Sequence, residues 1–469
     1  MRNPAHILIG VALLGGCNMA PKYVQPVPPV PASFPAALSS GGEAATAVGW
    51  QRFFGDPQLK AYIAAALANN RDLAAAAARI EQARAQFRIQ QAGRLPQVDG
   101  SAGATRTQAP LGSLGLGNNL GSGAITYNQY SVRVATSAFE LDFWGRVRNL
   151  SESARRSYLA TVEAQRAFRL SLISDVAATY YSIRAGEEGI ALAERTVASR
   201  RQGLAIAKLR MDAGVTSSVD YDQSTALLTQ AQTELADLRR TTEQQRDQLL
   251  VLIGGPIDAP PPDGRPIADA GQFAALDPGL PSTLLQSRPD ILQAEHQLRA
   301  ANADIGAARA AFFPTISLTG ALGFVSPKLQ GLFDSSNRNW SFGGSAALPI
   351  FDWGKRERQL DAAKARRDEL VATYQRTVQN AFREVSDALV GRQSYREQIQ
   401  AQERAVAAQR RLAETAMLRY DNGIAIYLEV LDAERNLFSA EQQLIRLRAT
   451  ELQNGVSLYT ALGGGNGDG

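Results

Sequence analysis

The side chains that most often perform catalysis or bind metal ions are scarce in this sequence. Its 469 residues include two histidines and one cysteine. His6 lies in an apolar N-terminal stretch, which leaves His296 and Cys17, and these two cannot build an intrachain disulfide or a His/Cys metal cluster. Neither the P-loop pattern nor the glycine fingerprint of dinucleotide-binding folds occurs. The sequence therefore predicts a protein that is not an enzyme and that needs no cofactor or metal.

The single cysteine is a candidate for lipid modification. It closes the tetrapeptide Leu14-Gly15-Gly16-Cys17, which follows a basic residue and a short apolar run. This order is typical of a secretory signal peptide, and the tetrapeptide resembles a bacterial lipobox, in which the cysteine becomes the acylated first residue. We expect residues 1–17 to be a lipoprotein signal peptide and Cys17 to be lipidated. An ordinary signal peptide with a chance cysteine is the alternative, and Asn18 favours sorting to the outer membrane.

Composition and charge narrow the class of protein further. Hydrophobic residues make up 45% of the chain and charged residues 20%, which excludes a disordered protein. The 49 basic residues nearly balance the 45 acidic ones without a long basic block, so nucleic-acid binding gains no support. Six of the fifteen residues from Pro21 to Pro35 are proline. We expect residues 18–49 to form an extended, lipidated tether, with the folded part starting near Trp50.

The rest of the chain divides into two halves that carry the same motifs in the same order. Asn69-Asn70-Arg71-Asp72-Leu73 returns 218 residues later as Ser287-Arg288-Pro289-Asp290-Ile291. The segment from Leu209 to Val215 returns 209 residues later, from Leu418 to Ile424. The smaller offset places a longer loop in the first half. We expect a first repeat at 50–255, a linker at 256–280, a second repeat at 281–464 and a tail at 465–469.

Each half is expected to begin with a helical stretch. In the first half Asp56 resembles an N-cap with Pro57 at the first helical position, and an alanine-rich helix follows to about Gly93, with a break near Asn70. Its counterpart in the second half would occupy about Pro289 to Phe312. These stretches precede the predicted strands.

Two proline-free stretches predict much longer helices. Arg146 to Met211 and Lys355 to Tyr420 contain 66 residues each, so each helix would be roughly 100 Å long at 1.5 Å per residue. In the second stretch apolar residues recur every three or four positions, a seam that needs a partner helix. Each long helix would turn at a glycine, Gly214 or Gly423. Shorter helices would then return over Ser218–Ile253 and Tyr427–Leu462.

The period of the apolar positions changes to two between these helices, which predicts two strands in each half. No later stretch reaches 18 consecutive apolar residues, so no transmembrane helix is expected. Four strands cannot close a membrane barrel, and an open edge in lipid would leave backbone groups unpaired, so the chain would have to oligomerise. The positions expected to alternate are Tyr130, Val132, Val134 and Ala138; Ile316, Leu318, Gly320, Leu322 and Phe324; and Trp340, Phe342, Gly344, Ala346, Leu348 and Ile350.

Two loops and two tryptophans flank the predicted strands. The glycine-rich loop Gln108 to Ala124 and the polar loop Ser326 to Asn339 would lie at one mouth of the barrel. Trp144 and Trp353, at the strand-to-helix junctions, fit an aromatic girdle at the opposite membrane interface. Packing between helix and sheet is the alternative for both tryptophans.

The chain resembles the outer-membrane factors of tripartite efflux systems, the TolC and OprM family, in its lipidated branch. The resemblance covers the whole mature chain and depends on the order of the motifs and on their duplication. It implies an α+β membrane protein: a trimer with one twelve-stranded outer-membrane β-barrel, four strands per chain, continued by a long α-helical barrel in the periplasm. The motifs that carry it are Cys17 to Pro31, Asp56-Pro57, Asn70-Arg71-Asp72-Leu73, Gly279 to Ser282, Arg288 to Ile291, Ala300 to Arg309 and Phe312-Phe313-Pro314.

The resemblance also implies a function. The trimer would passively conduct small molecules, such as drugs, received from an inner-membrane transporter of the RND type and a periplasmic membrane-fusion adaptor. Its other partner would be outer-membrane lipid. Type I protein secretion is the alternative cargo, and a non-conducting coiled-coil lipoprotein that spans the envelope is the alternative function. An envelope hydrolase would need a nucleophile and base that the histidine count disfavours.

Two sites follow from the resemblance, and the first is the pair of hairpin tips. In the family the adaptor touches these tips, and the matching residues here are Gly214 with Val215 and Gly423 with Ile424. Both glycines would also serve simply as helix caps, which is the alternative for this site.

The second site is the narrow periplasmic end of the tunnel, the aperture. The resemblance places it at Glu429 and Asp432, which share a helix face at i, i+3, so that threefold symmetry would gather six carboxylates around one axis and favour cations. Alternatively, these acids and Asp220 only complement helix N-termini. Tyr420 and Asp220 match positions that link neighbouring coils in TolC, whereas Ala425 replaces the basic residue of that latch.

Overall fold

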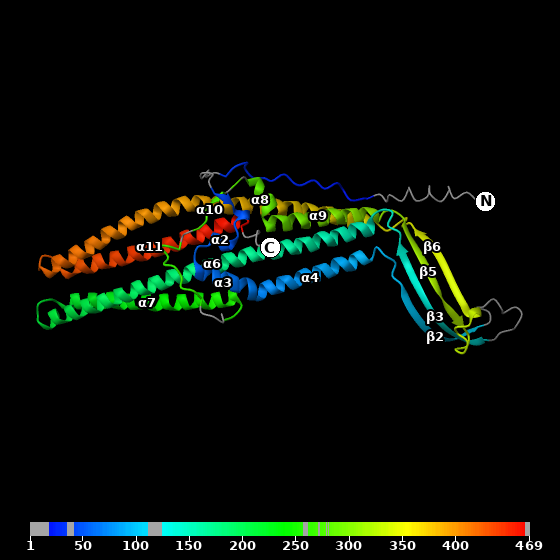
Figure 1. Ribbon diagram of the computed structural model, residues 1–469, viewed down its shortest axis with the longest axis horizontal. Helices are drawn as coiled ribbons and strands as arrows, with labels where there is room; N and C mark the ends of the chain where they lie inside the picture. Colours follow the sequence, from blue (N-terminus) through cyan, green and yellow to red (C-terminus); the bar gives the residue numbers. More distant parts are fainter. Residues whose placement is uncertain are drawn as a thin grey trace. The chain divides into compact units, whose positions relative to one another are not determined.

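The computed structural model describes residues 18–34, 42–110, 124–256, 261–270, 273–277, 279 and 281–464. Cys17 and most of the glycine-rich loop predicted from Gln108 to Ala124 lie outside these residues. The chain forms two compact units (Figure 1). The first unit comprises Met1–Pro26, Glu81–Ala160 and Ala294–Thr373, and the second comprises Val27–Ile80, Thr161–Gln293 and Tyr374–Gly469.

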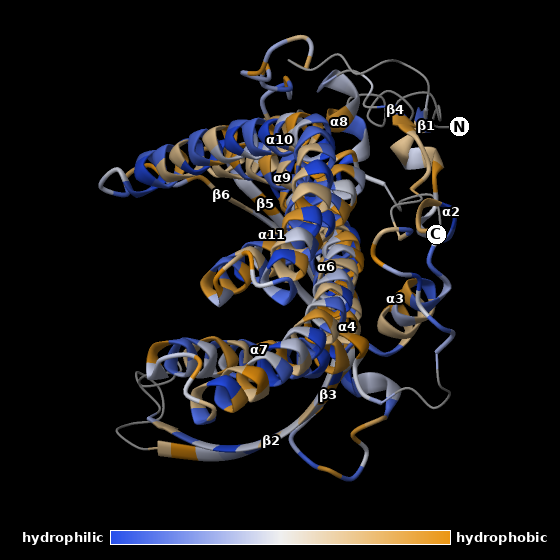
Figure 2. Ribbon diagram, turned by 90° about the vertical axis from the view of Figure 1, so that its left-hand side faces the viewer, coloured by the Kyte–Doolittle hydropathy of each residue, from blue (hydrophilic) through white to orange (hydrophobic). Residues whose placement is uncertain are grey.

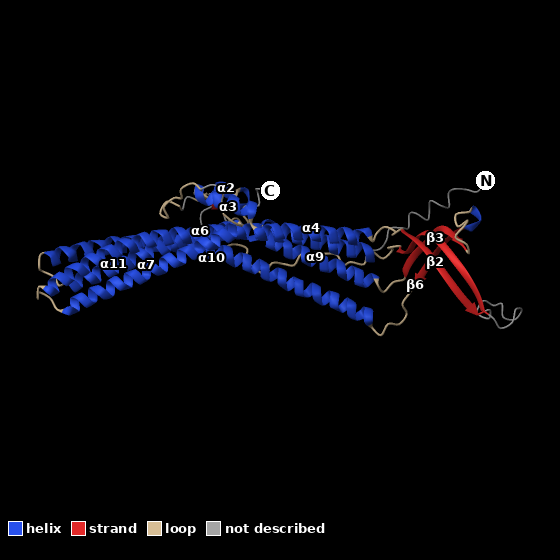
Figure 3. Cartoon of the chain, turned by 90° about the horizontal axis from the view of Figure 1, so that it is seen from below, coloured by secondary structure: helices blue, strands red, loops and turns tan. Residues whose placement is uncertain are grey.

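The first unit contains an antiparallel sheet of four strands, as the sequence predicted. The strands are β2 (Asp99–Pro110), β3 (Ala124–Glu140), β5 (Thr315–Ser326) and β6 (Arg338–Ala347), and they lie side by side in the order β2-β3-β5-β6 (Figure 1). Figure 3 draws the strands of this sheet in red. A short 3₁₀ helix, η3 (Ser335–Asn337), precedes β6. The outer strands β2 and β6 each leave one edge without a partner strand among the described residues, and such an edge is a template for pairing with another strand.

The structure corrects two details of the predicted strands. The pairing of β3 with β5 shifts register between Thr136 and Phe139, and Ala138 has φ of +49°. Ala138 therefore lies in a bulge and does not continue the alternation. Strand β6 ends at Ala347, so the alternating residues Leu348 and Ile350 follow the strand instead of belonging to it.

The second unit contains a small sheet that the sequence did not reveal. Strand β1 (Glu43–Ala44) pairs in parallel with β4 (Leu276–Asp277). Two residues per strand give no periodicity to detect, which is why pattern reading misses such a pair. The short helices η1 (Ala45–Ala47) and α2 (Trp50–Phe53) follow β1. Regular structure thus begins at Glu43, inside the stretch 18–49 that was expected to be an extended tether.

The helix expected before the sheet is broken at Asn70 in the first half. Helix α3 (Pro57–Asn69) ends there and α4 (Arg71–Ala92) begins, because the backbone of Asn70 is extended at ψ 128°. Its carbonyl Oδ1 accepts from the amide of Leu73 at 2.8 Å and caps α4. The corresponding pair in the second half is α8 (Pro281–Ser287) and α9 (Pro289–Ala310), broken at Arg288.

The long helices agree with the sequence prediction to within one residue at each end. Helix α6 (Arg146–Asp212) is followed by α7 (Ser218–Ile253), and α10 (Lys355–Asp421) is followed by α11 (Tyr427–Ala461). Within the second unit, α6 with α7 and α10 with α11 form two helical hairpins (Figure 1). Hydrophilic residues occur all along these helices (Figure 2), and no helix in the described ranges is both long and apolar enough to cross a membrane.

An aromatic core holds the shorter elements of the second unit together. The ring of Phe53 stacks on Tyr459 at 4.1 Å and on Phe273 at 5.0 Å between centroids. Beside it, the buried carboxylate of Asp56 caps α3 and accepts from the hydroxyl of Tyr180 at 2.9 Å. The predicted capping of α3 by Asp56 with Pro57 at the first position is therefore confirmed.

The two junction tryptophans differ in their environments within the first unit. Trp144 stacks on Phe313 at 4.6 Å and donates from Nε1 to the carbonyl of Pro314 at 2.9 Å. Trp353 is 88% exposed and touches Phe351 edge-on. The contacts of Trp144 are those of a packed side chain, which was the alternative interpretation. Trp353 has the exposed side chain that a residue of an aromatic girdle needs.

Candidate functional site

The two hairpin tips have the same backbone geometry. Gly214 has φ of +69° and Gly423 has φ of +70°, and a Cβ at either position would meet nothing within 4 Å. The amide of Val215 donates to the carbonyl of Arg210 at 2.9 Å, and that of Ile424 to Arg419 at 2.8 Å. This is the helix C-terminus that requires a left-handed residue, so the conformation and not the available space selects glycine here.

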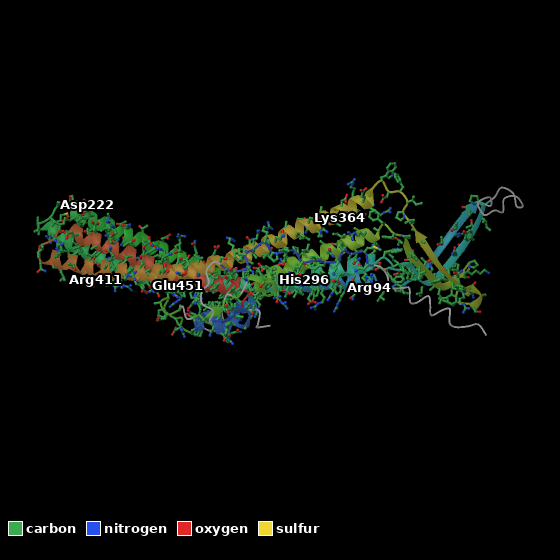
Figure 4. All side chains as sticks on the ribbon, turned by 90° about the horizontal axis from the view of Figure 1, so that it is seen from above. Arg94, Asp222, His296, Lys364, Arg411 and Glu451 are labelled. Carbon is green, nitrogen blue, oxygen red and sulfur yellow. The ribbon has the colours of Figure 1, made fainter. Side chains whose placement is uncertain are left out.

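The residues beside the glycines are exposed and apolar. Val215 is 65% and Ile424 71% exposed. Further exposed apolar side chains surround both tips; they are Leu209, Val219, Leu418 and Ile426. Asp222 and Arg411, labelled in Figure 4, lie on the two hairpins near these tips. Two small apolar surfaces at the ends of polar helices are suited to contact another protein.

The predicted aperture acids each pair with an arginine of the same chain. Glu429 Oε2 lies 3.1 Å from Arg419 Nη1, and Asp432 Oδ1 lies 2.9 Å from Arg435 Nη2. All four side chains are about half exposed. Glu429 lies in the first turn of α11 and Arg419 in the last turn of α10, where each charge also complements its helix dipole. The two acids are therefore balanced by cations, which the spacing of the acids alone did not indicate.

Tyr420 accepts a hydrogen bond from an arginine of the other hairpin. Arg210 Nη1 donates to the Tyr420 hydroxyl at 2.7 Å, and its guanidinium lies 5.0 Å from the ring centroid. The link joins the end of α6 to the end of α10. Asp220 has its backbone carbonyl bonded by Ser224 Oγ at 2.8 Å, and its half-buried carboxylate forms no ion pair with any described residue.

Tyr420 belongs to a buried hydrophobic cluster. Its members are Ala416, Tyr420, Tyr427, Val430 and Leu431, with Leu227 and Ala433 packed against them. The ring of Tyr427 lies 5.0 Å from that of Tyr420, and its hydroxyl would be 2.0 Å from a Cβ on Gly203 of α6. Gly203 is thus a notch that admits Tyr427, and this glycine inside a long helix is the only sequence signal for the contact.

A second contact between the two hairpins lies further from their tips, and the sequence analysis did not predict it. Arg200 is buried on α6 and donates to the carbonyl of Leu227 on α7 at 2.7 Å. Ser199 donates to Glu434 Oε1 on α11 at 3.2 Å. Burial raises the pKa of Glu434, and burial lowers the pKa of Arg200. The described residues contain no group of three metal-binding side chains, here or elsewhere.

Comparisons with known proteins agree with this architecture. The family model described as outer membrane efflux protein matches residues 62–255 and 280–464. The solvent efflux pump outer membrane protein SrpC of Pseudomonas putida is 42% identical over 464 residues, covering 98% of this chain and 97% of that protein. The cation efflux system protein CusC of Escherichia coli is 39% identical over 460 residues, covering 96% of this chain and 97% of that protein.

Solved structures show the same similarity. The open-state channel MtrE of Neisseria gonorrhoeae has a TM-score of 0.87 and 36% identity, covering 96% of this chain and 98% of that one. A structure of CusC has a TM-score of 0.84 and 38% identity, covering 96% of this chain and all of that one. SrpC and MtrE are both named as proteins of the outer membrane. The family model matches both halves of the chain, and SrpC aligns with it over nearly the full length of both proteins. The chain therefore belongs to the outer membrane efflux protein family.

Proposed function

We propose that this protein is the outer-membrane channel of a tripartite efflux pump and that it conducts small toxic molecules passively to the exterior. The observation that carries the proposal is the combination of two long hairpins with apolar tips and a four-stranded sheet with two open edges. Relatives are named for the efflux of solvents, toluene, antibiotics and cations. Those names favour small molecules over the alternative cargo, secreted proteins.

The channel would be a homotrimer. Within the part of the chain that the structure describes, β2 and β6 have one unpaired edge each, and pairing β6 of one copy with β2 of the next would satisfy both edges. Three copies of four strands make one twelve-stranded barrel, which removes every edge from the lipid. The long helices of the three copies would continue this barrel as a tunnel.

Each end of the channel would have its own partner. The exposed apolar residues at the Gly214 and Gly423 tips would dock the periplasmic membrane-fusion adaptor, which would link the channel to an inner-membrane transporter of the RND type. At the N-terminus, Cys17 would be acylated and would carry several acyl chains. Stable anchoring requires more than one acyl chain, so this modification would hold the protein in outer-membrane lipid.

The aperture would be lined by paired charges instead of by bare carboxylates. Glu429 with Arg419 and Asp432 with Arg435 would repeat three times around the axis. A ring in which each acid has its own arginine selects weakly between ions, because the fields of the two charges oppose each other. Removing the acids should therefore favour anions, and removing the arginines should favour cations.

Single-channel conductance tests both the channel and its aperture. The detergent-extracted oligomer would be compared in planar bilayers with Glu429→Ala plus Asp432→Ala, and with the matched variant Arg419→Ala plus Arg435→Ala. We expect both variants to conduct more than the wild type and to shift ion selectivity in opposite directions. Equal large conductance in all three proteins would contradict the aperture, and an assembled oligomer that never conducts would support the coiled-coil scaffold.

A further inference from the structure

The segment that follows Cys17 is docked along two helices. Residues 18–34 form no helix or strand, as their prolines predict, yet polar side chains of α9 hold their backbone in place. Asn302 Nδ2 donates to the carbonyl of Pro21 at 2.8 Å, and Arg309 Nη1 donates to that of Met19 at 3.5 Å. The prolines set the extended conformation, and these contacts keep the segment from being a free tether.

Tyr23 is the side chain that inserts into the groove between the helices. It packs on a buried cluster to which α9 contributes Leu298 and Ala301 and α10 contributes Leu370. The guanidinium of Arg299 lies 4.6 Å from the centroid of its ring, within the range of a cation–π contact. Tyr23 therefore fills a gap in the hydrophobic packing of two helices that are distant in sequence.

The hydroxyl of Tyr23 also has a hydrogen-bond partner. It donates to Glu295 Oε1 at 3.3 Å, and the same oxygen is held by Arg299 at 2.6 Å. Burial, together with the negative charge of Glu295, raises the pKa of Tyr23 to about 12, so the phenol keeps its proton over the physiological range. A buried polar group with a partner is compatible with a permanent contact.

A glycine in α9 provides the space for this segment. A Cβ on Gly306 would lie 2.6 Å from Nδ2 of Asn149 on α6, 2.7 Å from the Cα of Ala20 and 2.8 Å from the Cβ of Ala20. Glycine inside a helix costs about 1 kcal/mol relative to alanine, and φ is not its reason here, because Gly306 is not among the glycines with positive φ. Two close approaches therefore favour glycine here, and they differ in kind. The Asn149 amide is the end of a side chain and can rotate away, whereas the Cα of Ala20 belongs to the backbone of the N-terminal segment and can move only with that segment.

We propose that residues 19–23 are a built-in clamp that joins α9 to α10 and fixes the start of the mature chain on the helices. The groove between α9 and α10 is an interaction surface whose occupant is this segment. Tyr23 lies six residues after Cys17, so a lipid on that cysteine is confined to within about 20 Å of the groove. The clamp concerns the packing of this chain and is independent of what the channel conducts.

Trypsin sensitivity at Lys22 tests the clamp. Lys22 is the only basic residue among residues 18–34, and its side chain is exposed. Cleavage after it requires this segment to leave the groove, because a protease needs a locally unfolded stretch. The purified full-length oligomer would be digested in detergent, and loss of the peptide ending at Lys22 would be followed by intact mass spectrometry. We expect Tyr23→Ala to be cleaved at least about tenfold faster than the wild type, because it loses a buried aromatic ring.

Three matched variants make the result decisive. Tyr23→Phe keeps the ring and should stay within about threefold of the wild-type rate, because it loses one hydrogen bond. Gly306→Ala keeps Tyr23 and favours the helix, yet it should accelerate cleavage by pushing Ala20 away. Val24→Ala changes a neighbour that is 77% exposed and should leave the rate unchanged. Wild-type cleavage rates in assembled Tyr23→Ala and Gly306→Ala oligomers would overturn the clamp.

Discussion

The two hairpin tips share a backbone but use their arginines differently. Arg210 and Arg419 occupy corresponding positions, 209 residues apart, as do Asp220 and Glu429. Arg419 pairs with Glu429 within its own hairpin, whereas Arg210 binds Tyr420 of the other hairpin. Among the described residues, Asp220 forms no ion pair like that of Glu429. Equivalent backbone positions can thus carry either a local charge pair or a link between hairpins.

The same contrast occurs where the shorter helices break. Asn70 Nδ2 donates to the carbonyl of Leu252 near the end of α7 at 2.8 Å, and Arg288 Nη1 donates to the carbonyl of Ala461 at the end of α11 at 2.9 Å. Both side chains satisfy a helix carbonyl that has no intrahelical partner. In the first half a neutral amide does this, and in the second half a buried cation does.

The largest expected effect comes from removing that cation. Arg288 also pairs with Asp290 at 2.7 Å and with Glu384 at 2.8 Å. We expect Arg288→Ala to lower the free energy of unfolding by about 3 kcal/mol, at the low end for a broken buried ion pair because both acids are partly exposed. Asn70→Ala should cost about 1 kcal/mol, as for a lost helix cap. Denaturant unfolding of the solubilised protein measures both.

Arg288→Lys is the control for charge alone. It keeps the cation but loses the guanidinium geometry, so its stability should lie between those of the wild type and Arg288→Ala. Equal losses for Arg288→Ala and Asn70→Ala would remove the contrast between the two breaks.

The junction tryptophans should show a smaller difference. Trp144→Phe loses the hydrogen bond to Pro314 and part of a stacked ring, for about 1 kcal/mol. Trp353→Phe in solubilised protein should change stability by less than about 0.5 kcal/mol, because its side chain is exposed. Thermal unfolding distinguishes the two, and a larger loss for Trp353→Phe would mean that it packs in the assembled protein.

The smallest effect concerns pH and the buried acid Glu434 of the second half. Burial raises the pKa of Glu434, so the folded protein favours the protonated carboxyl more than the unfolded chain does. The stability that this preference adds is complete below the pKa of Glu434 in the unfolded chain. It is lost as pH rises through the pKa of Glu434 in the folded protein. Glu434→Gln imitates the neutral form. It should raise Tm at pH 7 to 8 and leave it unchanged near pH 4, as measured by thermal unfolding across that range.

In the first half, the position that corresponds to Glu434 is occupied by Thr225, whose side chain does not titrate. Glu403→Gln, at an acid paired with Arg448 at 2.9 Å, serves as a control for losing an exposed carboxylate. A Tm gain for Glu434→Gln that is the same at every pH would rule out titration of Glu434 as the cause.

Much of the fold could be predicted because it depends on local signals. The break at Asn70, the glycines at 214 and 423 and the ends of α6, α7, α10 and α11 follow from turn chemistry, capping and helical period. The bulge at Ala138 and the pair β1–β4 were missed, since both depend on a partner strand far along the chain. The exposure of Val215 and Ile424 was consistent with their place at a turn.

The sequence by itself determined the element order, the two equivalent halves and the positions of the tip residues, because each is set by neighbours within a few turns. Only the tertiary structure decided what those residues touch. Arg210 reaches Tyr420, Arg419 balances Glu429 and Tyr23 enters the groove between α9 and α10. The residues of the first and third of these contacts are hundreds of positions apart, and all three depend on how helices pack, which no local pattern encodes.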